Sequence, residues 1–203
     1  MPPQRAARGT AIGVTGSPGT GKKTVSPLLA GLLGLDLVEI NAVARSLSEP
    51  DERGEVEVDP VRLRAELRRR RGASPQVLSG HLLAEVVRSG DVGFVAVLRC
   101  EPRTLKRRLA SRGYPGGKVL ENVEAELIGV VLDQALRAFG PERVHEYDTT
   151  NADARSVAEA IARDVRAGLP AADGRWTDWT IRYDSSTKLR SLLSRPRTEP
   201  AST

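Results

Sequence analysis

Residues 11–24 read AIGVTGSPGTGKKT and carry the strongest structural signal of the sequence. Its first residues, Ala11 to Val14, are apolar and rich in β-formers, and the glycine-rich run 16–21 follows at once, which predicts a buried strand entering a tight loop. A helix is expected from near Lys22, because leucines then recur at helical spacing, and Gly34 is placed to end it. The stretch therefore predicts a strand, a glycine-rich loop and a helix in immediate succession.

Residues 16–22 have the spacing G-x-x-x-x-G-K of a phosphate-binding loop between a strand and a helix. Glycines let successive backbone N–H groups turn toward one point, and the helix end behind them adds positive potential. Lys22 would reach the β- and γ-phosphates of a nucleoside triphosphate, so we expect ATP and Mg²⁺ as cofactors. An ordinary glycine-rich turn is the alternative, but it does not explain the matched strand, lysine and helix. The candidate nucleotide-binding residues are Gly16, Pro18, Gly19, Thr20, Gly21, Lys22, Lys23 and Thr24.

The residue after the loop lysine departs from this pattern. A Ser or Thr hydroxyl that ligates Mg²⁺ is expected there, and the chain has Lys23 instead. The hydroxyl is displaced to Thr24, our candidate metal ligand, but a shift of one residue turns a side chain by about 100° on a helix of ~3.6 residues per turn. The Lys23 ammonium group can contact a phosphate instead. We therefore expect nucleotide binding to survive this change better than metal-assisted catalysis.

The rest of the chain alternates short apolar runs with helical patterns, which predicts a three-layer α/β/α sandwich around a parallel sheet. We expect one domain over residues 10–169, a disordered leader at 1–9 and a largely flexible tail at 170–203. In that tail, Trp176 and Trp179 either pack back on the domain or offer a partner surface. Further strands are expected at 35–40, 76–78, 92–98 and 143–149, and further helices at 60–71, 102–111, 121–139 and 154–169.

Composition limits the classes of protein. Hydrophobic residues make up 39% of the 203 residues and aromatic ones 3%, so a single aliphatic core is expected. The formal charge of +5 suits phosphate-bearing partners such as nucleotides or RNA, and it is equally compatible with a solvated basic surface. A single cysteine, Cys100, excludes an internal disulfide framework and favours the cytoplasm. No uncharged run approaches the roughly 18 residues of a membrane span, so no membrane association is expected.

Five motifs occur in an order found in the archaeal and nuclear branch of adenylate kinases: GSPGTGKKT, INAVAR, SGH, LKRRLASRGY and EN-x-EAEL. Over residues 11–149 the chain resembles the adenylate kinase isoenzyme 6 family. The resemblance implies a P-loop NTPase core with a five-stranded parallel sheet of order 2-3-1-4-5. It also implies a nucleoside monophosphate-binding insertion at about residues 38–66 and a short lid at about 111–121.

The resemblance also assigns roles to single residues. Arg45 in INAVAR falls where the family holds the acceptor phosphate, and Arg112 in SRGY falls where a lid arginine closes on ATP; guanidinium groups suit both tasks. His81 in SGH matches a family histidine near the phosphates. Ser79 stands where the family has an acid that fixes Mg²⁺ through water. Surface arginines and a structural histidine are the alternatives. The expected catalytic residues are Lys22, Arg45, His81 and Arg112.

The resemblance implies transfer of the γ-phosphoryl group of ATP to AMP or a related nucleoside monophosphate, with slow ATP hydrolysis. It also implies a role in small ribosomal subunit maturation, with ribosomal protein uS11 and the pre-rRNA environment as partners. Two alternatives stay open. One is a weakly active or inactive ATP-binding assembly factor, and the other is a P-loop kinase for another small acceptor such as shikimate.

Overall fold

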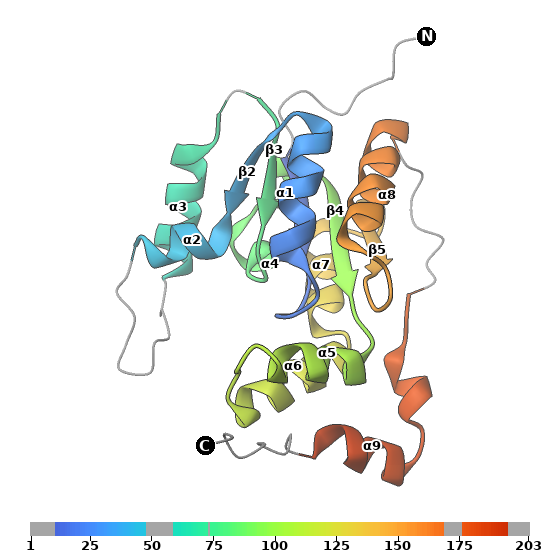
Figure 1. Ribbon diagram of the computed structural model, residues 1–203. Coiled ribbons are helices and arrows are strands. Elements are labelled where there is room, and N and C mark those ends of the chain that lie inside the picture. The colour runs from blue at the N-terminus through green and yellow to red at the C-terminus, as the bar shows by residue number, and fades with distance from the viewer. Residues whose placement is uncertain (1–10, 48–58, 73, 169–175, 195–203) are drawn as a thin grey trace, which may run out of the picture.

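The computed structural model describes residues 11–47, 59–72, 74–168 and 176–194. Its centre is one sheet of five strands in the order β2-β3-β1-β4-β5, and every neighbouring pair is parallel (Figure 1). The three-layer fold and the strand order that the sequence predicted are therefore confirmed. The strands are β1 (Ala11–Thr15), β2 (Asp36–Glu39), β3 (Gln76–Ser79), β4 (Val92–Arg99) and β5 (Val144–Asp148).

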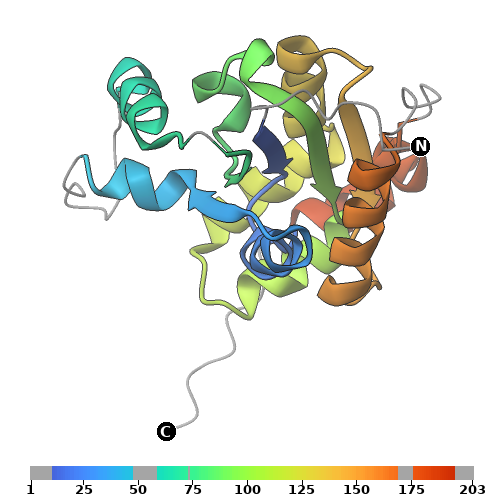
Figure 2. The same cartoon turned by 90° about the horizontal axis from the view of Figure 1, so that it is seen from above.

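Helices cover both faces of this sheet. On one face α1 (Lys22–Leu33) and α8 (Ala154–Ala167) pack on alternate residues of β4, such as Phe94 and Leu98. The residues between them, such as Val95, face α4 (Leu83–Val86) and α7 (Val130–Phe139) on the other side. The view in Figure 2 shows α1 and α8 on one side of the sheet and α7 on the other. The two-residue period of the strand thus divides the core into two apolar layers.

The chain between β2 and β3 forms α2 (Ile40–Arg45) and α3 (Pro60–Arg70). The predicted start of α3 is confirmed, because the Asp59 carboxylate accepts the Val61 N–H at 2.8 Å and Pro60 takes the first helical position. The six residues of α2 were not predicted as a helix. The predicted insertion at about 38–66 includes residues 48–58, which lie outside the described part, so the insertion stays a prediction.

The long helix predicted over 121–139 is two helices in the structure. The first, α6, spans Gly116–Leu127 and begins inside the predicted lid, and α7 starts at Val130. Gly129 between them has a φ of 72°, a left-handed conformation that ends the helical path and that glycine adopts without strain. The break lets α6 pack on α5 (Pro102–Ala110) while α7 packs on the sheet.

The segment after α8 also differs from the expectation. Within the predicted flexible tail, the structure places a 3₁₀ helix, η2 (Trp179–Tyr183), and then α9 (Ser186–Leu193). Trp179 is 2% exposed and packs in an apolar cluster with residues of α5 and α6, which decides in favour of packing over a partner surface for this tryptophan. Burial of these aromatic groups stabilises a segment whose polar composition had suggested flexibility. In the described part of the chain, no helix has both the length and the apolar character needed to span a membrane.

Candidate functional site

The loop between β1 and α1 has a backbone that requires glycine. Gly16, Gly19 and Gly21 have φ angles of 143°, 91° and 106°, which residues with a Cβ rarely adopt. Space excludes a side chain as well, because a Cβ on Gly16 would lie 2.7 Å from the Thr20 hydroxyl. A Cβ on Gly19 would lie 2.7 Å from the Leu105 side chain. The glycine spacing seen in the sequence therefore corresponds to a folded loop with a definite shape.

Hydrogen bonds fix this loop from within and from β5. The backbone N–H of Thr20 donates to the Ser17 carbonyl at 3.2 Å, and the Thr20 hydroxyl donates to the same oxygen at 2.8 Å. Beyond the end of β5, the Thr149 hydroxyl donates to the Thr20 carbonyl at 2.8 Å. The amides of Lys22 and Lys23 open α1, where no preceding turn supplies acceptors. The loop and the helix end together make a preformed site for an anion.

The Lys22 side chain folds back over the loop. Its ammonium group donates to the carbonyls of Gly16 and Ser17, with 3.0 Å to the latter. Burial lowers the pKa of Lys22 to about 8, and the charge of Glu126 opposes this change. The ammonium is thus partly desolvated and held by two neutral carbonyls. Anionic phosphate oxygens can replace these carbonyls and form stronger, charge-assisted hydrogen bonds with the ammonium.

His81 lies within electrostatic reach of Lys22. Burial lowers the pKa of the His81 ring, and the positive charge of Lys22 lowers it further. The Asn41 amide nitrogen lies 3.2 Å from His81 Nδ1. Since that amide nitrogen can only donate, Nδ1 accepts and the neutral ring carries its hydrogen on Nε2. The structure therefore brings two of the four predicted catalytic residues together.

Two buried polar atoms beside the loop have no hydrogen-bond partner within the described residues. They are the hydroxyl of Thr15, which precedes Gly16, and the side-chain oxygen of Asn41, the neighbour of His81. Buried polar atoms are nearly always satisfied in folded proteins, so such atoms call for a ligand or a water. Together with the glycine loop and Lys22, they fit a polar ligand such as a nucleotide.

The described side chains do not form a complete magnesium site by themselves. Lys23, a cation, is exposed at the position where a hydroxyl would ligate the metal, and Thr24 offers one exposed hydroxyl. The Ser79 hydroxyl accepts a hydrogen bond from Ser26 at 2.8 Å and supplies no carboxylate. Across residues 11–47, 59–72, 74–168 and 176–194, no cluster of three acidic, histidine or cysteine side chains could hold a metal. The metal role of Thr24 stays a prediction.

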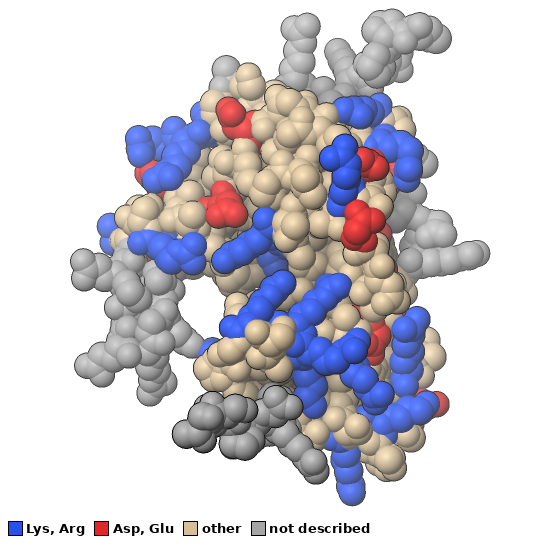
Figure 3. All heavy atoms as spheres, viewed as in Figure 1, with Lys and Arg blue, Asp and Glu red and all other residues tan. Residues whose placement is uncertain are grey.

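The two predicted arginines do not reach the loop in the structure. Arg45 is exposed at the end of α2, and Arg112 is exposed in the turn after α5. No interaction between either arginine and the loop is found among the described residues, and their roles stay predictions. Figure 1 shows α2 and α5 on different sides of the loop. Figure 3 shows Lys and Arg side chains gathered over α5 and α6, on the face next to the loop.

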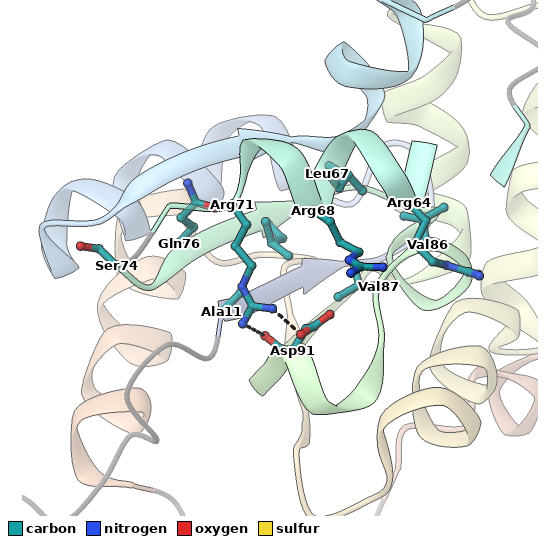
Figure 4. Close-up of a pocket in the computed structure, with 11 residues that line it drawn as sticks. Ala11, Arg64, Leu67, Arg68, Arg71, Ser74, Gln76, Val86, Val87 and Asp91 are labelled. Carbon is teal, nitrogen blue, oxygen red and sulfur yellow. Dashed lines mark hydrogen bonds and ion pairs between the residues drawn. The ribbon is translucent and has the colours of Figure 1, made fainter. Parts of the chain in front are cut away.

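A separate hollow lies at the opposite end of the sheet, between α3 and the amino ends of β1 and β4. Arg64, Arg68 and Arg71 line it with Ala11 and Asp91, and Arg71 forms an ion pair with Asp91 (Figure 4). The glycine loop follows the carboxyl end of β1, so this hollow is no part of the candidate site.

Two residues that the sequence did not single out support the loop. Glu126 of α6 accepts a hydrogen bond from the Ser17 hydroxyl at 2.7 Å, and the Arg99 guanidinium donates to Glu126 at 2.8 Å. Both charged side chains are 1% exposed. A signal was present, because Glu126 lies beside Leu127 and three residues after Val123, on the apolar face of its helix. A carboxylate on such a face predicts a buried partner.

Comparison with known proteins agrees with this geometry. The family model described as "AAA domain" matches residues 12–129. A protein of Thermococcus onnurineus named "Putative adenylate kinase" is 39% identical over 175 residues, which cover 85% of this chain and 93% of that protein. A protein of Methanothermobacter thermautotrophicus with the same name is 40% identical over 164 residues, which cover 77% of this chain and 90% of that protein. Shikimate kinase from Acinetobacter baumannii shares the fold, with a TM-score of 0.54 and 22% identity over 77% of this chain and 92% of that one.

These matches identify the family at the level of archaeal adenylate kinases, while the narrower resemblance to isoenzyme 6 stays a prediction. The matched family model includes the glycine loop, Lys22, His81 and Glu126. The archaeal relatives match along most of their own length. This chain belongs to the AAA-domain family and to the family of the archaeal proteins named "Putative adenylate kinase".

Proposed function

We propose that the chain binds ATP on residues 16–24 and transfers the γ-phosphoryl group to AMP or a related nucleoside monophosphate. The observation that carries the proposal is the glycine loop with Lys22 folded over it, a preformed anion site that already contains a desolvated ammonium group. The names of the archaeal relatives support the same reaction. We expect Mg²⁺ to enter as part of the MgATP substrate, with its charge on the phosphates.

In this reaction Lys22 exchanges the carbonyls of Gly16 and Ser17 for oxygens of the β- and γ-phosphates. The amides that open α1 and the helix dipole hold the same anion. His81 donates from Nε2 to a phosphate oxygen. An acceptor phosphate oxygen forms the new bond to the γ-phosphorus, the bond to the β–γ bridging oxygen breaks, and ADP leaves with that electron pair. Arg45 and Arg112 would close on the acceptor and the donor.

A coupled assay of ADP formation from MgATP and AMP tests the proposal. Lys22→Met should lower kcat/KM by about 10²-fold or more, because charge developing on the transferred group loses its nearest cation. Lys188→Met is the matched control, since Lys188 is exposed on α9 and should leave the rate unchanged. Equal rates for Lys22→Met and the wild type would refute the kinase proposal. Runs without AMP, and with shikimate in its place, measure ATP hydrolysis and the alternative acceptor.

A second candidate is an ATP-binding factor in small-subunit ribosome assembly with little turnover. Two observations favour it. Lys23 and Ser79 stand where the loop pattern and the family resemblance imply groups that organise Mg²⁺. Arg103 and Arg107 are exposed on α5, and Lys and Arg side chains gather over α5 and α6 (Figure 3). Retention of the chain on immobilised ribosomal protein uS11, in an ATP-dependent manner, is the expected result. Absence of retention with and without ATP counts against this candidate.

A further inference from the structure

A buried charge network joins the glycine loop to the C-terminal segment. We call Ser17, Arg99, Glu126, Glu146 and Trp179 the Glu126 network. One oxygen of Glu126 accepts from the Ser17 hydroxyl at 2.7 Å. The other accepts from Arg99 at 2.8 Å and from the Trp179 indole N–H at 3.4 Å. Arg99 also pairs with Glu146 at 2.5 Å. Five side chains from the loop, α6, two strands and η2 therefore meet in one hydrogen-bonded cluster.

The charges of this network balance only when Lys22 is included. Glu126 and Arg99 are 1% exposed, and buried ions are costly without partners. Within this network Arg99 lies between the carboxylates of Glu126 and Glu146. Lys22 adds a second positive charge, and Glu126 in turn raises the Lys22 pKa against the effect of burial. Glu126 therefore has cations on both sides, although it lies next to an anion site.

Ser17 is held at both its side chain and its carbonyl. Thr20 and Lys22 bond to the carbonyl, and Glu126 bonds to the hydroxyl. When Lys22 turns to a bound phosphate, the Ser17 carbonyl loses that partner. The bond to Glu126 remains, so it keeps the loop in the shape that accepts the triphosphate.

The C-terminal segment contributes hydrogen-bond partners to these charged groups. Besides Trp179, the Thr177 N–H donates to Glu146 at 2.8 Å, and Arg99 donates to the Thr177 carbonyl at 3.4 Å. Trp179 itself is 2% exposed in the cluster formed by α5, α6, η2 and α9. The position of this segment and the geometry of Glu126 therefore depend on each other.

We propose that Glu126 is a positioning residue for the phosphate-binding loop, and that it couples nucleotide binding at the loop to docking of the segment 176–193. Glu126 acts through Ser17 and does not touch the nucleotide. Because coupling between two sites is reciprocal, a nucleotide that fixes Ser17 also stabilises Trp179 in its place. The inference rests on the proposed binding of ATP at the loop.

Calorimetric titration with ATP tests the positioning role on the full chain. Ser17→Ala should weaken ATP binding about ten-fold, which corresponds to about 1.4 kcal/mol, and should leave the circular dichroism spectrum unchanged. Glu126→Gln should weaken binding by at least as much. Glu124→Gln, an exposed position on the same helix, is the control and should bind as the wild type. If Glu126→Gln fails to fold, Ser17→Ala decides alone. Wild-type affinity in folded Ser17→Ala would overturn the positioning role.

Trp179 fluorescence tests the coupling. Trp176→Phe leaves Trp179 as the single tryptophan of the chain. Saturating ATP should change its emission, and the change should vanish when Ser17→Ala is added, although calorimetry still shows bound ATP. The coupling would be overturned if ATP changed the emission equally in Trp176→Phe with and without Ser17→Ala. It would also be overturned if bound ATP left the emission of Trp176→Phe unchanged. Failure of the wild type to bind ATP would instead refute the proposed function, so the two failures are distinguishable.

Discussion

The charge state of Lys22 should control the affinity for ATP. Burial shifts the pKa of this ammonium from 10.5 to about 8 in the free protein. Raising the pH through that value removes the positive charge that faces the phosphates. With a pKa of about 8, roughly nine tenths of the molecules carry the charge at pH 7 and roughly one tenth at pH 9. If the charged form alone binds ATP well, the dissociation constant rises about ten-fold over this range, or about 1.4 kcal/mol.

Isothermal titration calorimetry with ATP at pH 7 and pH 9 measures this change directly. The wild type should lose about ten-fold in affinity, while Lys22→Met should bind weakly and equally at both pH values, because no ammonium remains to titrate. Lys188→Met keeps the loop intact and should follow the wild type. A wild-type affinity that does not change between pH 7 and pH 9, or a Lys22→Met variant that loses as much affinity as the wild type, would show that the Lys22 charge does not control ATP binding.

The same shift predicts the sign of a stability effect. Between pH 8 and pH 10.5 the unfolded chain holds a proton on Lys22 that the folded chain has released. The unfolded state therefore binds more protons, and the free energy of unfolding contributed by this group rises with pH in that window. Urea unfolding of the wild type and Lys22→Met at pH 7 and pH 10 measures this effect. From pH 7 to pH 10 the free energy of unfolding of the wild type should rise relative to that of the variant. A relative fall would contradict the burial of the ammonium.

Three further changes test other parts of the account. Gly16→Ala should abolish ATP binding measured by calorimetry, because its Cβ would meet the Leu98 carbonyl at a positive φ; binding at wild-type affinity would be contradictory. Lys23→Thr combined with Ser79→Asp should raise the rate of Mg²⁺-dependent ADP production, and an unchanged rate would show that neither position limits catalysis. Leu98→Ala should lower the free energy of urea unfolding by about 2 to 5 kcal/mol, whereas exposed Ile181→Ala should change it by less than about 0.5 kcal/mol.

Much of the fold could be predicted because local pattern and global structure agree. The runs 11–15 and 92–99 are largely buried strands, as their apolar composition predicted, while β2 at the edge of the sheet is partly exposed. The glycine spacing after Thr15 likewise matches the folded loop. The break at Gly129 was missed, because apolar residues keep a helical period across it and only the left-handed backbone shows that the helix ends there. The strand order came from the family resemblance, since no local pattern encodes which strands pair.

The helices of the C-terminal segment were not predicted, for a similar reason. Its polar composition suggested flexibility, while Trp179, Tyr183 and Leu192 each become buried against α5 and α6. The surface that receives them is formed by residues far away in the sequence. Composition describes the segment alone and carries no information about such a surface.

The candidate site was predictable where chemistry follows from one continuous motif. Residues 16–21 form a glycine loop that leads into α1, and His81 lies within electrostatic reach of Lys22. The binding and catalytic roles of these residues stay predictions. Glu126 and Arg99 were missed, because the hydroxyl that Glu126 binds lies 109 residues away in the chain. Arg45 and Arg112 stay predictions, since their roles require contact with nucleotides.

We propose that the glycine loop and Lys22 hold the triphosphate of ATP. Calorimetric titration of the wild type and Gly19→Val with ATP, in the absence of AMP, tests this proposal, because a side chain at Gly19 would clash with Leu105 at a φ of 91°. The wild type should bind one ATP saturably, and the folded variant should bind none. Saturable binding of equal affinity to both proteins, or no binding to the folded wild type, would show that the triphosphate is not held by this loop.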